Sequence, residues 1–187
     1  MNFYKKYNSV ICEIRCVLDN IDSQEIEKFI ELFKKNTDIN NIVVAGAGRM
    51  GYAGRGFAMR LGHLGFRAWA IGDTTVPMIQ EKDLLVILSG SGNTQTIYDI
   101  AHTASINGAQ IALITNNPDS RIGKLATKII KISNFHNEEA GIKRSVQPMT
   151  TLNEQVATLL LDSIVLAIME NTGETHETMW SRHSNLE

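Results

Sequence analysis

The sequence contains an apolar run that leads directly into small and hydroxyl-bearing residues, Asp83-Leu84-Leu85-Val86-Ile87-Leu88-Ser89-Gly90-Ser91-Gly92-Asn93-Thr94. The run predicts a buried strand, and the residues from Thr94 onward predict a helix. The glycines allow the backbone to turn and to approach a ligand closely. Hydroxyl groups and the free amides of the helix N-terminus then face the same oxygen atoms. We therefore expect the phosphate of a small molecule to bind at Ser89, Gly90, Ser91, Gly92 and Thr94.

Strands and helices alternate along the rest of the chain. The apolar periodicity predicts helices near residues 3–19, 22–36, 50–64, 94–106, 120–125 and 148–171, and strands near 41–45, 66–71, 84–88, 110–115 and 128–132. Strands separated by helices of this length indicate right-handed crossovers and a parallel sheet covered on both faces, which is a three-layer α/β sandwich. Ligands bind to such sheets beyond the carboxyl ends of the strands, where the strand order reverses. If the order is 2-1-3-4-5, as in flavodoxin-like winding, residues 46–51 and 89–94 face one cleft.

Length and composition indicate one globular domain. A chain of 187 residues with 43% hydrophobic and 20% charged residues is long enough to bury a sizeable core. Within this domain we distinguish N-terminal helices (1–38), an α/β core (39–171) and a C-terminal tail (172–187) that contributes to the site.

Charge and hydropathy argue against several classes of partner. The formal net charge of −2 gives no reason to expect nucleic acid or an anionic membrane surface as a partner. The N-terminus lacks the apolar stretch of a signal peptide, and the longest apolar region, residues 156–169, is too short to span a bilayer. Cys12 and Cys16 lie four residues apart on a predicted helix, without a histidine pair nearby, so we expect reduced thiols and no metal site. These features predict a cytoplasmic protein.

A second glycine-rich segment, Gly46-Ala47-Gly48-Arg49-Met50-Gly51, fits the dinucleotide-binding fingerprint between a strand and a helix. Asp73 follows at about the distance of a ribose-binding carboxylate. Taken alone, this motif favours an enzyme that uses a nicotinamide cofactor. However, the second anion pocket at residues 89–94 is not required by a dinucleotide site, and the chain lacks a second mononucleotide-binding half. The other interpretation is a sugar phosphate held between the two loops, with no cofactor.

Further motifs follow one another through nearly the whole chain: Val44-Ala45-Gly46-Ala47-Gly48-Arg49, Phe57-Ala58-Met59-Arg60-Leu61, His63-Leu64-Gly65-Phe66, Gly72-Asp73-Thr74-Thr75, Gln147-Pro148-Met149, Glu154-Gln155 and Arg182-His183-Ser184-Asn185-Leu186. Together with the loop at residues 89–94, they resemble the 6-phospho-3-hexuloisomerases, a family within the sugar isomerase (SIS) domain group. The loop alone indicates only the wider SIS group, whereas the segments at residues 147–149 and 182–186 are more specific.

This resemblance implies the interconversion of 3-hexulose 6-phosphate and fructose 6-phosphate, a step of the ribulose monophosphate route that assimilates formaldehyde. It also implies a phosphorylated ketohexose as the substrate, strand order 2-1-3-4-5, no metal, and a homotetramer (or a dimer) with sites at subunit boundaries. Two alternatives stay open: a non-catalytic SIS protein that senses a sugar phosphate, and the nicotinamide-dependent oxidoreductase.

The chain departs from the family pattern at two positions. Met50 stands where the family usually has serine, so the first loop contributes only its backbone amides, as at Gly48, and the side chain of Arg49. Asn153 stands where an aromatic residue is common. Both changes bear on substrate choice, and neither removes the loop at residues 89–94.

The reaction requires a base that takes a proton from the carbon beside the carbonyl and returns it to the neighbouring carbon through a cis-enediol. The residues alone favour a solvated glutamate at position 154, stabilised there by the helix dipole. The family resemblance instead makes Glu154 our candidate, and partial burial among Met149, Leu152 and Val156 would suit its carboxylate to this role.

His183 is the second catalytic candidate, since an imidazole can move a proton between the enediol oxygens. From a C-terminal tail it reaches the cleft of a neighbouring subunit more readily than its own. His63 can be a satisfied core residue, a structural partner of a helix N-cap or a residue of the cleft, and the family resemblance leads us to expect it beside the cleft. We expect Asp73 at the carboxyl end of a strand.

The helix predicted at residues 148–171 is apolar on more than one face. Such a helix must be buried all round, either in its own core or against another subunit. With the two N-terminal helices, it predicts an oligomer independently of the family resemblance.

Overall fold

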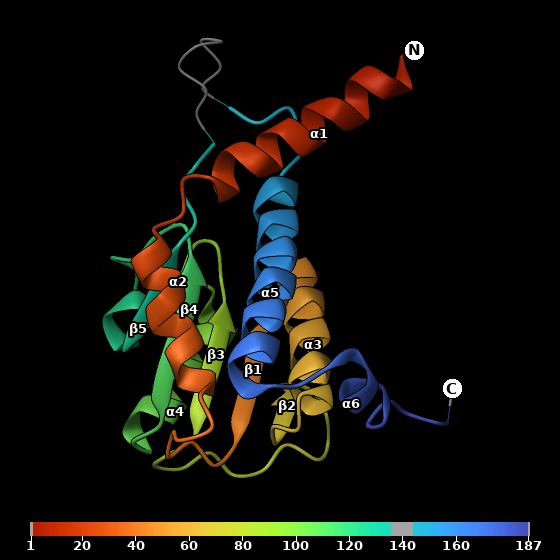
Figure 1. Cartoon of the computed structure of the whole chain (residues 1–187). Coiled ribbons are helices and arrows are strands. Elements are labelled where there is room, and N and C mark those ends of the chain that lie inside the picture. Colours follow the sequence, from red (N-terminus) through yellow and green to blue (C-terminus); the bar gives the residue numbers. More distant parts are fainter. Residues whose placement is uncertain (1, 136–143, 187) are drawn as a thin grey trace.

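A five-stranded sheet with the order β2-β1-β3-β4-β5 forms the centre of the molecule (Figure 1). The computed structural model describes residues 2–135 and 144–186. The strands are β1 (Ile42–Gly46), β2 (Ala68–Ala70), β3 (Leu84–Leu88), β4 (Gln110–Thr115) and β5 (Lys128–Lys131). All neighbouring strands are parallel. The predicted α/β class and strand order are confirmed.

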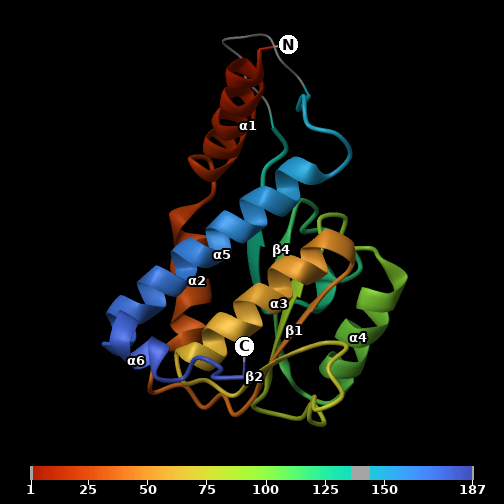
Figure 2. The same cartoon turned by 90° about the vertical axis from the view of Figure 1, so that its right-hand side faces the viewer.

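Two apolar clusters cover the two faces of the sheet. Val44 and Leu84 pack on one face with α1 (Phe3–Leu18), α2 (Ser23–Ile30), α3 (Gly48–His63) and α5 (Thr151–Thr172). Val43 and Leu85 pack on the other face with α4 (Gln95–Ile106). Figure 2 shows α3 and α5 side by side on one face and α4 on the other. Adjacent strand residues point to opposite faces, so the continuous apolar run of β3 fills both layers of the core.

Several element boundaries differ from the predicted ones. The helix predicted from residue 50 begins at Gly48, and the strand predicted at residues 66–71 is shortened to β2. The helix predicted at 22–36 ends as α2 at Ile30, followed by a 3₁₀ turn at Glu31–Phe33. Only a 3₁₀ turn, Gly123–Leu125, forms within the helix predicted at 120–125. A short helix, α6 (His176–Trp180), follows α5.

The prediction that the apolar region of the long C-terminal helix is too short to span a bilayer was wrong as to length. With 22 residues, α5 has the length and composition of a helix that can cross a membrane, a test that the core helices of soluble proteins also pass. One side of α5 is buried against the rest of the chain, at Val156, Ala157, Leu160, Leu161, Ile164, Val165 and Ile168. The other side leaves Leu159 and Leu166 exposed. The packing identifies α5 as a core helix, but within one chain it is not buried all round.

The first helix, α1, projects from the body of the protein, and only its C-terminal half packs against α5 (Figure 1). On the buried side of α1, the carboxylate of Glu13 is 5% exposed. It accepts hydrogen bonds from Ser145 Oγ (2.6 Å), the Val146 backbone N–H (2.7 Å) and Gln147 Nε2 (3.0 Å). These bonds fix the segment that leads into α5 and so position the first turn of that helix.

Candidate active site

A cavity of about 190 Å³ lies at the carboxyl edge of the sheet, beyond β1 and β3. It is lined by Ala47, Met50, Leu88, Ser89, Gly90, Ser91, Thr94, Thr150, Asn153 and Glu154. These residues belong to the N-caps and N-terminal turns of α3 and α5, the N-cap of α4, the end of β3 and the loop that follows it. The partial positive charges of three helix N-termini therefore converge on one cavity, which favours an anionic ligand.

Hydrogen bonds to neighbouring segments hold the loop after β3 in place. The Gly90 carbonyl accepts bonds from the Asn116 backbone N–H (3.0 Å) and the Thr115 hydroxyl (3.0 Å). Within the loop, the Gly92 backbone N–H donates to Ser89 Oγ (3.2 Å). The Thr94 side chain makes no capping bond to α4, so its hydroxyl can serve a ligand. The loop is therefore rigid before any ligand arrives.

The glycine at position 92 is required by geometry. Its φ of +63° lies in the left-handed region, and a Cβ there would overlap the hydroxyl of Ser120. In the first loop, a Cβ at Gly51 would lie 2.6 Å from the Gly46 carbonyl oxygen. The close approach of β1 and α3 thus accounts for these two glycines of the dinucleotide-like motif without a dinucleotide.

Glu154 lies in the first turn of α5 with its side chain 14% exposed. Its Oε2 lies 3.0 Å from Nη1 of Arg49, and its Oε1 accepts a 2.7 Å bond from the Thr150 hydroxyl. Arg49 Nη1 also donates to Thr151 Oγ1 (3.3 Å). The carboxylate is therefore held in one orientation at the cavity wall rather than solvated. Its surroundings are more polar than predicted, because Met149 is exposed.

The remaining predicted residue of the first loop, Gly48, begins α3 with a φ of +57°. Asp73 forms an ion pair with Arg55 (3.3 Å), and its Oδ2 accepts a bond from the Ala70 backbone N–H (3.4 Å). These contacts tie the end of β2 to α3. Asp73 does not line the cavity that contains Glu154.

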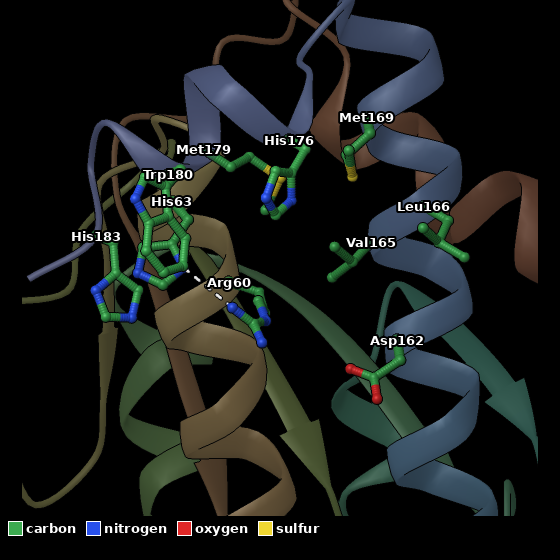
Figure 3. Close-up of a pocket in the computed structure, with 10 residues that line it drawn as sticks. All are labelled: Arg60, His63, Asp162, Val165, Leu166, Met169, His176, Met179, Trp180 and His183. Atoms are coloured by element: carbon green, nitrogen blue, oxygen red, sulfur yellow. Dashed lines mark hydrogen bonds between the residues drawn. The ribbon is translucent and has the colours of Figure 1, made fainter.

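His63 and His183 lie at the far end of α3, in a separate pocket of about 530 Å³ (Figure 3). The His183 ring stacks on His63 (5.3 Å between ring centroids) and on Trp180 (5.0 Å). Helix geometry separates residues 49 and 63 by about 21 Å. Within one chain, therefore, the structure does not bring either histidine to Glu154.

The C-terminal segment is fastened to this end of α3 by Arg182. Its Nη1 donates to the His63 carbonyl (2.8 Å) and to Glu174 Oε2 (2.7 Å). The hydrogen bond from Arg182 lowers the pKa of Glu174 below its ordinary value of 4.5, and the same pair raises the pKa of Arg182. Arg182 thus determines where His183 lies.

Sequence reasoning did not identify Thr150, Asn116 or Glu13 as supports of the site. A Thr at the N-cap of α5 and an Asn directly after β4 were visible signals for the first two. The hydrogen-bond partners of Glu13 lie 132 or more residues further along the sequence, so no local sequence pattern predicts these contacts. Among the described residues, no cluster of three or more His, Cys, Asp or Glu side chains could hold a metal ion.

The chain matches known proteins over most of its length. The SIS domain family model matches residues 37–159. The chain is 41% identical over 150 residues to the 3-hexulose-6-phosphate isomerase of Bacillus subtilis (79% of this chain, 80% of the relative). It is 36% identical over 171 residues to the enzyme of the same name from Mycobacterium gastri (91% of this chain, 86% of the relative).

Among solved structures, the chain is similar to a protein of Methanococcus jannaschii whose crystal structure led to an inferred function of 3-hexulose-6-phosphate isomerase. The TM-score is 0.82 at 28% identity, and the match covers 98% of this chain and 99% of that one. Another crystal structure, of a hypothetical protein, matches with a TM-score of 0.88 at 30% identity, over 98% of this chain and 97% of that one.

Replacing Gly92 by alanine is expected to distort the loop after β3. The methyl group would overlap Ser120, and the left-handed backbone is unfavourable for alanine, so we expect a loss of about 1–3 kcal/mol of stability. Affinity for inorganic phosphate should fall at least tenfold, as measured by calorimetry on the folded variant. Gly56→Ala is the control: its Cβ meets nothing within 4 Å in the middle of α3, and it should stabilise the protein by up to about 1 kcal/mol. Unchanged phosphate affinity in folded Gly92→Ala would show that the loop is not the anion site.

Acid is expected to release the C-terminal segment from α3. Because the folded-state pKa of Glu174 is lowered, its pair with Arg182 is intact above pH 4.5 and is lost as the pH falls through that lowered pKa. We expect the fluorescence of Trp180, recorded below pH 5 in a Trp69→Phe background, to change in this range. Arg182→Ala should show the released signal already at pH 7, whereas Arg15→Ala, from an exposed pair with Asp19, should not. A wild-type signal from Arg182→Ala at pH 7 would contradict this role.

Proposed function

Because this chain belongs to the SIS-domain family and, within it, to the 3-hexulose-6-phosphate isomerases, we propose that this sugar-phosphate isomerase interconverts 3-hexulose 6-phosphate and fructose 6-phosphate. The observation that carries the proposal is one cavity that joins an anion-binding loop, residues 89–94, to the fixed carboxylate of Glu154. The phosphate binds at the loop, and the reacting carbons lie beside the carboxylate.

In the proposed mechanism, Glu154 removes the proton from carbon 2 of 3-hexulose 6-phosphate, whose carbonyl is at carbon 3. The electron pair of that C–H bond forms the carbon 2–carbon 3 double bond, and the carbonyl oxygen gains a proton to give the cis-enediol. The hydroxyl on carbon 2 then loses its proton as carbon 3 takes one from Glu154, which leaves the carbonyl at carbon 2 of fructose 6-phosphate. Proton transfer of this kind suits a positioned carboxylate.

Arg49 complements the base. Its guanidinium lies 3.0 Å from the carboxylate, within reach of oxygens on the same carbons. A fixed cation at this place stabilises the negative charge that develops on the enediol oxygens. Gly48 and the other backbone amides at the start of α3 add donors on the same side.

The alternatives have less support. A sugar-phosphate sensor is favoured by Met50, which lines the cavity in place of a hydroxyl, but a sensor does not need a fixed carboxylate there. The nicotinamide interpretation loses its basis, because strand–helix packing accounts for Gly46 and Gly51 and Asp73 pairs with Arg55. We also propose that the reaction belongs to the ribulose monophosphate route of formaldehyde assimilation and takes place in the cytoplasm.

Glu154→Gln tests the base. Glutamine preserves the shape and an oxygen for Thr150 but cannot accept the proton, so kcat should fall by about 10²- to 10⁴-fold with little change in KM. The assay follows fructose 6-phosphate formed from enzymatically generated 3-hexulose 6-phosphate. Glu170→Gln, at an exposed position of the same helix, should behave as wild type.

Turnover that survives in Glu154→Gln would move the base elsewhere, with His183 the next candidate. If the wild type shows no turnover but is stabilised against heat by fructose 6-phosphate, the proposed reaction is wrong and a binding protein or another isomerase is indicated.

We further propose a homotetramer, or a dimer, in which His183 of one subunit completes the cavity of a neighbour. The distance along α3 supports this arrangement, as do the exposed apolar side chains on the helices, Phe3, Tyr4, Tyr7, Ile11, Leu159 and Leu166. Exposed apolar side chains on helices are a feature of protein interfaces.

Subunit mixing tests this assembly. Glu154→Gln and His183→Asn should each be impaired, and hybrids formed by unfolding and refolding them together should regain turnover well above the average of the two, because some cavities then receive both intact side chains. An activity equal to that average would place each site within a single chain.

A further inference from the structure

Asn116, directly after β4, connects three segments around the cavity. Its backbone N–H donates to the Gly90 carbonyl (3.0 Å) in the anion-binding loop. Its side-chain Nδ2 donates to the Ile132 carbonyl (2.9 Å) after β5 and to Oδ1 of Asn153 (3.2 Å) in the first turn of α5. One residue thus ties the loop, the sheet edge and the helix that carries Glu154.

The orientation of the Asn116 amide is fixed. Both bonds of Nδ2 go to acceptors, and a rotated amide would place its carbonyl oxygen against the Ile132 carbonyl. Oδ1 of Asn116 is buried without a partner among the described residues, and it would lie 3.3 Å from a Cβ at position 90. The close approach to Gly90 leaves little room for rotation.

This arrangement in turn determines how Asn153 presents its amide. An amide side chain has one acceptor oxygen and an NH₂ group with two donors. Asn116 occupies the oxygen of Asn153, and within the described part of the chain the NH₂ group forms no hydrogen bond. Asn153 lines the same cavity as Ser89 and Glu154, so a ligand there meets a donor whose orientation is already set.

We propose that Asn153 Nδ2 donates a hydrogen bond to an oxygen of the sugar, and that Asn116 is the positioning residue that orients it. The inference rests on the proposed function and refines it. The loop at residues 89–94 holds the phosphate, and Glu154 and Arg49 act at the reacting carbons. Asn153 then forms a hydrogen bond to a hydroxyl or carbonyl oxygen of the sugar chain. The preferred ligand is a phosphorylated ketose with a hydroxyl or carbonyl oxygen opposite this amide. The side chain of Met50 lines the same cavity but offers no hydrogen-bond donor. Asn153 is therefore the residue that distinguishes one sugar phosphate from another by hydrogen bonding.

Calorimetry with two ligands tests the contact. Asn153→Ala should bind fructose 6-phosphate about three- to tenfold more weakly, as expected for one hydrogen bond to an uncharged group, while its affinity for inorganic phosphate stays unchanged. Asn153→Leu, which preserves the branching and the number of non-hydrogen atoms of the side chain, should give the same pattern. Asn171→Ala, at an exposed position near the far end of α5, is the matched control and should leave both affinities at the wild-type value.

A double-mutant cycle tests the positioning role. Asn116→Ala should weaken fructose 6-phosphate binding and leave inorganic phosphate binding intact, and adding it to Asn153→Ala should cause little further loss. Fully additive losses would overturn the positioning role. Equal losses for the two ligands would show general damage to the cavity and would overturn the sugar contact.

The outcomes separate this inference from the proposed reaction. If fructose 6-phosphate binds to wild type no more tightly than inorganic phosphate, or if Asn153→Ala binds it normally, the inference fails even when turnover is observed. If turnover is absent but fructose 6-phosphate binding depends on Asn153 as described, the inference stands and the proposed reaction fails.

Discussion

Three helix N-termini point at one cavity, and the other features of the site depend on this convergence. α3, α4 and α5 begin at the carboxyl edge of the sheet, and residues at their N-caps and in their N-terminal turns line the same space. Their unpaired backbone amides and dipoles favour negative charge before any side chain is considered. Side chains and hydrogen bonds add to this effect. Arg49 and Thr150 orient Glu154. The Thr115 hydroxyl at the end of β4 donates a hydrogen bond to the Gly90 carbonyl and so fixes the loop after β3.

The parts of the fold that sequence predicted well are those set by local patterns. β3 and β4 were predicted to the residue, because each is an apolar run between polar or glycine-containing segments. The start of α3 was missed by two residues because Gly48 enters the helix with a left-handed φ. α5 begins at Thr151, three residues after the predicted start at Pro148, because Met149 has a left-handed φ of +56° through which a helix does not continue.

The site was predictable in its types of residue and less so in its contacts. The hydroxyl and glycine loop was identifiable from residue type and spacing, whereas Glu154 was identified through the family resemblance, because a glutamate in the first turn of a helix is by itself equally suited to solvent. The pairing of Arg49 with Glu154 joins helices far apart in sequence and could not be seen locally. His63 was expected beside the cleft, but it is the last residue of α3, whereas Arg49 lies in the first turn, so the length of the helix separates the two residues within a chain.

The hydrogen bonds of Glu13 also constrain the order in which this protein assembles. The first helix leaves the ribosome long before its acceptor segment, because Ser145 lies 132 residues further along the chain. Until Ser145, Val146 and Gln147 arrive, this carboxylate must stay in water, since burying it alone is unfavourable. The N-terminal helix is therefore synthesised early, but it can bury Glu13 only after residues 145–147 have been synthesised. The start of α5 is held in place only when these residues have formed their hydrogen bonds to Glu13. A truncated chain that lacks these contacts can therefore contain the sheet, although the start of α5 and the Glu154 that it carries are then not held in position.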